Sequence, residues 1–240
     1  MVDDTIARRN FLLGAGTAVA AGLAPLAAPA DASAAEPPAA AAGAAAPAEP
    51  EPLLALTATE AAFLSAAADT MIPADELSPS GTDCGIVTYI DRQLAGAYGA
   101  GAKMYRNGPF RRGKPEQGYQ LALTPREYFA TGIAAANAWM RKTYGKELDR
   151  LSAAERAAAL GAMEHGTAEL ENFSARAFFG RLHGMVMEGF FSDPMYGGNR
   201  NKAGWAMLGF PGLPATYADK VDAYFNKRYA APPKSIADFS

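Results

Sequence analysis

The signal that most constrains the fold of this 240-residue chain is a helix-start motif that occurs three times. It is present as Thr57-Ala-Thr-Glu60, Thr124-Pro-Arg-Glu127 and Ser152-Ala-Ala-Glu155. In such a capping box the hydroxyl accepts from a backbone N–H of the first helical turn, and the glutamate accepts from the N–H of the capping residue. Apolar residues follow each motif at helical spacing. Each motif therefore predicts the start of a helix.

Helical periodicity and stop signals predict how far the helices extend. We expect about six of them, at residues 57–72, 86–106, 124–145, 152–165, 174–190 and 217–225. Gly96, Gly99 and Gly101 weaken the second half of the second helix, because glycine lowers helix propensity. No run alternates apolar and polar residues at the period of a strand. The predicted fold is all-α, a single helical domain with long ordered loops.

The first 52 residues are typical of an export signal and a linker. Arg8-Arg9 precedes an uncharged run from Leu13 to Leu26, which is the order of a twin-arginine signal. We expect residues 1–34 to be this signal, residues 35–52 to be a disordered Ala/Pro-rich linker, and residues 53–240 to be the folded domain. A retained N-terminal anchor is the alternative, and the run is short for a membrane span of about 20 apolar residues.

Charge and cysteine content exclude several classes of protein. The formal net charge is −3, so the chain lacks the overall excess of basic residues that is typical of nucleic-acid-binding proteins. The single Cys84 rules out an internal disulfide and haem attachment through Cys-x-x-Cys-His. In an exported chain a lone cysteine is either a buried small apolar residue or the partner in an intersubunit disulfide.

The stretch from Glu188 to Gly212 is the main candidate for a functional surface. Glycine and proline punctuate it, so we expect a structured loop rather than a helix interior or a long strand. Its aromatic side chains are buried within the domain or cover a partner, since contiguous exposed apolar surface marks an interaction site. The predicted interface residues are Phe190, Phe191, Asp193, Tyr196, Trp205 and Phe210.

These six residues have different expected roles. We expect Phe190 and Phe191 to begin on the preceding helix and anchor the loop. Asp193 precedes a proline and is expected to brace the turn by accepting backbone N–H groups. Tyr196, Trp205 and Phe210 are the predicted partner surface. If all three are buried within this chain, the loop is a structural clasp instead.

Motifs for independent catalysis are missing from the sequence. It contains no Gly-x-Gly-x-x-Gly after a strand, no phosphate-binding Gly-Lys-Ser/Thr loop and no His-Glu-x-x-His. The remaining enzyme hypothesis is a metal-binding or catalytic site formed by Asp193, His183 and Glu188. The interface hypothesis, by contrast, predicts no catalytic, cofactor-binding or metal-binding residues in this chain.

Several segments together resemble the gluconate 2-dehydrogenase subunit 3 family. They are the twin-arginine signal, Thr57-Ala-Thr-Glu60 leading to Met71-Ile72-Pro73-Ala-Asp75, Gly85-Ile-Val-Thr-Tyr-Ile-Asp91, and the loop from Glu188 to Gly212. The resemblance covers nearly everything after Leu53, and the loop is its most specific part.

The resemblance implies a non-catalytic small subunit of a membrane-associated dehydrogenase that oxidises sugars or polyols. Such a chain holds no cofactor of its own. Its implied partners are an FAD-containing catalytic subunit of the glucose-methanol-choline type and a cytochrome c subunit with c-type haem. The resemblance also implies a role in maturation and in co-export to the periplasm through the twin-arginine machinery. The segment 107–123 is expected either to wrap a partner or to fold back on the domain.

Overall fold

The computed structural model describes residues 52–111, 113–114, 117–214 and 216–239. The predicted signal with Arg8 and Arg9, and nearly all of the predicted linker, lie outside these residues. From Leu53 onward the chain forms one compact unit.

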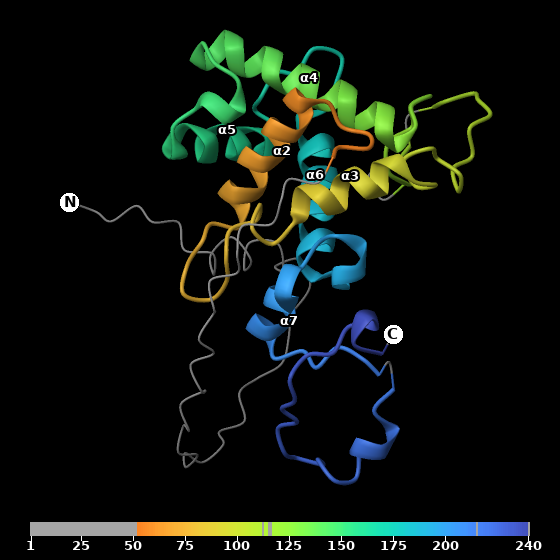
Figure 1. Cartoon of the computed structure of the whole chain (residues 1–240). Coiled ribbons are helices and arrows are strands. Elements are labelled where there is room, and N and C mark those ends of the chain that lie inside the picture. The colour runs from red at the N-terminus through yellow and green to blue at the C-terminus, as the bar shows by residue number, and fades with distance from the viewer. Residues whose placement is uncertain (1–51, 112, 115–116, 215, 240) are drawn as a thin grey trace, which may run out of the picture. The chain divides into compact units, whose positions relative to one another are not determined.

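The described residues form six α-helices and no β-strand, which confirms the all-α prediction (Figure 1). The helices are α2 (Ala58–Met71), α3 (Ile86–Ala95), α4 (Pro125–Tyr144), α5 (Ala153–His165), α6 (Ala175–Phe191) and α7 (Ala203–Leu208). Short 3-10 turns connect several of them, among them Pro194–Tyr196 and Arg200–Lys202. None of the described helices combines the length and the apolar character needed to cross a bilayer.

The predicted helix starts are confirmed. Thr57, Thr124 and Ser152 each form a complete capping box at the start of α2, α4 and α5. The Ser174 side chain accepts a hydrogen bond from the Ala177 N–H and begins α6 without a box. Gly145 ends α4 in the left-handed conformation that favours glycine. Local capping chemistry therefore sets these boundaries.

Two predicted helices need correction. The helix expected to continue to Arg106 ends at Ala95, and hydrogen-bonded turns follow it. Gly99 approaches the Leu94 carbonyl oxygen so closely that a Cβ there would lie 1.9 Å from it. This approach suits a turn built on glycine and not a continued helix.

The helix expected at 217–225 is also wrong. Only a 3-10 turn at Ala218–Lys220 forms there, and Val221 and Phe225 are 62% and 72% exposed. Apolar residues at helical spacing stabilise a helix in a protein mainly by burying one face, and this segment has no such burial. The sixth helix is instead the short α7, inside the segment predicted to be a loop.

Helix α6 lies at the centre of the hydrophobic core. It packs against α3, α4, α5 and α7, and Figure 1 shows it passing through the middle of the bundle. Phe178 and Leu182 on α6 are completely buried. The ring of Phe178 lies 6.3 Å from that of Phe63 on α2 and 6.1 Å from that of Phe129 on α4. This packing holds α6 in the core, and the candidate interface begins where α6 ends at Phe191.

Candidate partner interface and adjoining pocket

Phe190 and Phe191 are the last two residues of α6, as the sequence predicts. Phe190 is 2% exposed and belongs to the core, whereas Phe191 is half-buried. Their rings meet edge to face with centroids 4.8 Å apart. The pair therefore connects the hydrophobic core to the beginning of the loop.

Asp193 braces the turn that follows α6. Its Oδ1 accepts from the Met195 N–H at 3.0 Å and begins the 3-10 turn Pro194–Tyr196. Its Oδ2 accepts from the Ile236 N–H at 2.9 Å, a residue 43 positions further along the chain. The predicted local brace is present, and the second bond joins the loop to the C-terminal segment.

Asn199 is a buried residue that the sequence analysis missed. It is 0% exposed and has a positive φ of 46°, a conformation that asparagine tolerates better than most residues. Its Nδ2 donates to the Ser192 carbonyl oxygen at 2.8 Å, and its Oδ1 accepts from the Gly204 N–H at 2.8 Å. One amide side chain thus links the end of α6 to the start of α7. The run Gly197-Gly-Asn-Arg-Asn201 was its only signal in the sequence.

Trp205 on α7 packs back onto α6. It is 7% exposed, and its Nε1 donates to the Phe191 carbonyl oxygen at 2.8 Å. Gly204 makes this approach possible, because a Cβ there would lie 2.3 Å from the Phe190 carbonyl oxygen. Trp205 is therefore covered by its own chain and supports the loop from inside.

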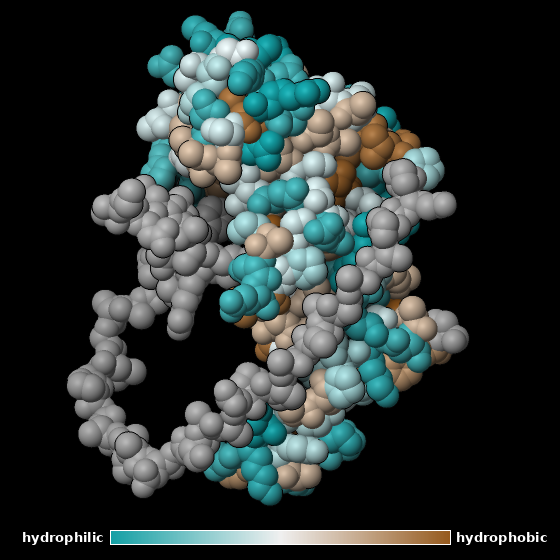
Figure 2. Space-filling model, turned by 60° about the vertical axis from the view of Figure 1, so that its left-hand side comes forward, coloured by the Kyte–Doolittle hydropathy of each residue, from teal (hydrophilic) through white to brown (hydrophobic). Residues whose placement is uncertain are grey.

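Tyr196 and Phe210 remain on the surface of the loop. They are 46% and 44% exposed, although the Phe210 and Trp205 rings also meet edge to face with centroids 5.3 Å apart. Met195 and Leu208 beside them are 49% and 62% exposed. The three predicted surface residues are not all buried, so the loop does not meet the condition for a purely structural clasp. On the face drawn in Figure 2, hydrophobic residues form small patches between hydrophilic ones.

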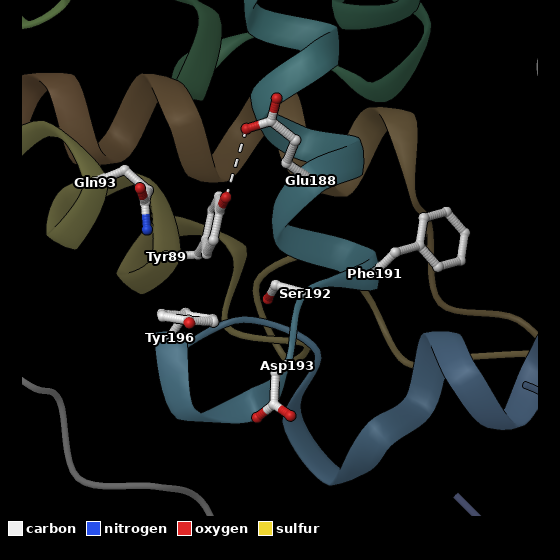
Figure 3. Close-up of a pocket in the computed structure, with 7 residues that line it drawn as sticks. All are labelled: Tyr89, Gln93, Glu188, Phe191, Ser192, Asp193 and Tyr196. Atoms are coloured by element: carbon white, nitrogen blue, oxygen red, sulfur yellow. Dashed lines mark hydrogen bonds between the residues drawn. The ribbon is translucent and has the colours of Figure 1, made fainter. Parts of the chain in front are cut away.

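A pocket of about 460 Å³ adjoins the loop. Side chains from α3, from the end of α6 and from the following turn line it, namely Tyr89, Gln93, Glu188, Phe191, Ser192, Asp193 and Tyr196. Figure 3 shows Tyr89 and Glu188 pointing toward one another. The Tyr89 hydroxyl donates to Glu188 Oε2 at 3.4 Å. Burial, followed by the negative charge of Glu188, raises the pKa of Tyr89 to about 12.

The structure brings together two of the three residues of the enzyme hypothesis. Asp193 and Glu188 line the same pocket, but His183 does not. The His183 ring stacks on that of Phe179 at a centroid distance of 6.1 Å, and burial lowers its pKa despite the opposing charge of Glu164. Within the described part of the chain, no group of three or more His, Cys, Asp or Glu side chains is arranged to hold a metal ion.

Cys84 lies just before α3 and is 1% exposed. Its thiol lies 3.7 Å from the Pro79 carbonyl oxygen. In this position the residue packs as a small apolar side chain, in line with the first of its two expected roles. A disulfide to a partner would require the surrounding segment to open.

The comparisons with known proteins gave one match. A model of the family described as gluconate 2-dehydrogenase subunit 3 matches residues 58–212, which is more than half of the chain. The matched region begins with α2 and ends at Gly212, so it contains the loop and the pocket. No curated protein and no solved structure matches the chain.

Proposed function

Because the chain belongs to the gluconate 2-dehydrogenase subunit 3 family, we propose that it is the non-catalytic small subunit of an FAD-dependent sugar or polyol dehydrogenase complex. In this proposal it stabilises the flavoprotein during maturation and accompanies it through the twin-arginine pathway. The catalytic subunit is of the glucose-methanol-choline type and holds FAD, while a cytochrome c subunit holds haem. The assembled complex works in the periplasm and is associated with the membrane through a partner.

The observation that supports a partner interface is a braced loop with exposed aromatic residues. Asn199 and Trp205 hold the loop from inside, yet Tyr196 and Phe210 remain nearly half exposed. A surface that is already ordered loses little conformational entropy on binding, so more of the contact energy contributes to affinity. Aromatic side chains are also enriched among the residues that dominate protein interfaces.

Co-expression with the flavoprotein subunit tests the proposal. We expect dehydrogenase activity with an artificial electron acceptor in the periplasmic fraction only when both chains are present. Substituting Arg8→Lys together with Arg9→Lys should keep both chains in the cytoplasm, because the export machinery reads the paired arginines. A flavoprotein that is exported and active without this chain would contradict the proposal.

The alternative function is an autonomous metal-binding protein or enzyme that uses Asp193, His183 and Glu188. Only the shared pocket of Asp193 and Glu188 favours it. Metal analysis and calorimetric titration of the purified chain with divalent cations provide the test. Binding that Glu188→Gln abolishes and His165→Gln leaves intact would support this alternative.

A further inference from the structure

The densest run of like charge in the sequence lies between α3 and α4. Residues 103–114, here called the basic arm, contain Lys103, Arg106, Arg111, Arg112 and Lys114, of which Arg112 lies outside the described residues. No aspartate or glutamate occurs between Asp91 and Glu116. The arm carries +5 in a chain whose total is −3, which leaves −8 for all other residues. Positive charge is therefore concentrated here against an acidic remainder.

The base of the arm is fastened to the helical body. The Tyr119 hydroxyl donates to the Leu123 carbonyl oxygen at 3.1 Å and lies 3.6 Å from Met104 Sδ, so the start of the arm lies against the segment that leads into α4. The Tyr119 ring stacks on that of Tyr128 of α4 with centroids 4.2 Å apart, and the Arg181 guanidinium of α6 lies over the Tyr119 ring, 5.4 Å from its centroid. Figure 1 shows the yellow-green loop leaving the bundle between α3 and α4.

The described charged side chains of the arm face solvent. Lys103, Arg106, Arg111 and Lys114 are all exposed, and none of them forms an ion pair with another described residue. Tyr105 is 82% exposed and Phe110 is 40% exposed. The described part of the arm thus presents four cations and two aromatic rings to solvent.

We propose that the basic arm binds an acidic surface of the catalytic subunit, with Tyr105 and Phe110 packed against that surface. This inference rests on the proposed function and adds a second contact region to the aromatic loop. Complementary charge accelerates association and sets orientation. Arginine, tyrosine and phenylalanine are the residue types that protein interfaces favour.

The fastened base favours a protein surface over a lipid surface. Arginine pairs with carboxylates in a fixed, often bidentate geometry, which benefits from a loop held at its base. Attraction to anionic lipid depends mainly on the number of basic residues near the membrane. A lipid partner is therefore the competing outcome of the test.

The test compares two variants of the full chain with equal change in charge. In the arm variant, four exposed cations are replaced: Lys103→Gln, Arg106→Gln, Arg111→Gln and Lys114→Gln. The control replaces four exposed cations at and beyond the other end of α4: Arg141→Gln, Lys142→Gln, Lys146→Gln and Arg150→Gln. A 20-residue helix is about 30 Å long, so the two sets are well separated.

Association with the purified FAD-containing catalytic subunit is measured by stopped-flow fluorescence at low and high salt. We expect the arm variant to associate about tenfold more slowly than the wild-type chain at low salt, with the control within about twofold. The difference should shrink at about 0.5 M NaCl, where charges are screened over a few ångströms. Tyr105→Ala, which leaves the charge intact, should accelerate dissociation. Circular dichroism verifies that the variants are folded.

Equal association rates for the arm variant and the control would overturn the inference. It would also be overturned if the arm variant binds the catalytic subunit normally but loses binding to phosphatidylglycerol vesicles. A wild-type chain that does not bind the catalytic subunit at any salt concentration would instead refute the proposed function itself.

Discussion

The indole Nε1 of Trp205 donates a hydrogen bond to the carbonyl oxygen of Phe191, 2.8 Å away, and holds α7 against the end of α6. Helix α6 ends at Phe191, and the carbonyls of a last helical turn have no partner within the helix. The tryptophan thus satisfies a helix-end carbonyl while its ring is buried. Trp205 therefore supports the loop from inside, and the loop exposes the neighbouring Phe210 on its surface.

Replacing Trp205 should therefore destabilise the fold. We expect Trp205→Ala to lower the free energy of unfolding by about 3–5 kcal/mol, because it removes a large buried ring. Trp205→Phe should cost about 1–3 kcal/mol through the unsatisfied Phe191 carbonyl. Urea unfolding followed by circular dichroism measures both changes. An unchanged midpoint for Trp205→Ala would show that α7 contributes nothing to stability.

Phe210→Ala should act on binding more than on folding. We expect the affinity for the catalytic subunit to fall by about 2 kcal/mol, the size typical of an interface anchor. Its stability should change by no more than about 1 kcal/mol, because the side chain is 44% exposed. Titration calorimetry of the pair measures the affinity. Leu77→Ala, at a residue 65% exposed and outside the loop, is the control that should bind normally.

Asn199→Ala tests the buried amide. The substitution leaves the Ser192 carbonyl and the Gly204 N–H without their partner, so we expect a loss of about 2–4 kcal/mol in unfolding free energy. Asn201→Ala is a matched control, because Asn201 also has positive φ, at 56°, but is exposed. Chemical denaturation of both variants separates backbone strain from lost hydrogen bonds. Equal losses would mean that the amide bonds are unimportant.

His183 should make stability depend on pH. Burial favours the neutral imidazole and lowers the pKa of His183 below its ordinary value of 6.5. The unfolded chain then binds more protons, so the free energy of unfolding should fall as pH drops through 6.5 toward 5. Melting temperatures measured from pH 8 to pH 5 test this. His183→Gln should flatten the slope, whereas His165→Gln should leave it in place.

Asp91 should hold the first residues of the folded domain in place. Its carboxylate is 3% exposed and accepts from the N–H groups of Leu54, Ala55 and Leu56 at 2.7–2.9 Å. Asp91→Asn keeps one acceptor oxygen and loses the charge, which should cost about 2 kcal/mol. Hydrogen exchange at residues 54–56 should accelerate. Asp222→Asn, on an exposed side chain, should leave that exchange unchanged.

The helices that begin with a capping box were predictable because their signals are local. Thr57, Thr124 and Ser152 each satisfy N–H groups only three residues away, so sequence spacing alone specifies the geometry. The turns after Ala95 were less predictable. Apolar spacing continued beyond that residue, while glycine made a close turn possible.

The candidate site was predictable only in part, because its contacts cross the chain. Asp193 was expected to brace its own turn, but its bond to Ile236 has no local signal. Tyr89 lines the pocket opposite Glu188, 99 residues away. The helix predicted near Tyr224 failed for a related reason. The apolar residues there have helical spacing but are not buried, and the Tyr224 ring packs against the Tyr229 ring with centroids 4.8 Å apart.

The C-terminal segment is hydrogen-bonded to the region that the family model matches. The family match ends at Gly212, yet Leu213 N–H donates to the Lys234 carbonyl at 2.8 Å and Ile236 N–H binds Asp193. A domain boundary drawn at the end of the family match would therefore separate residues that are hydrogen-bonded to one another. A truncation that removes Ile236 therefore also removes a hydrogen bond that holds Asp193 in the loop.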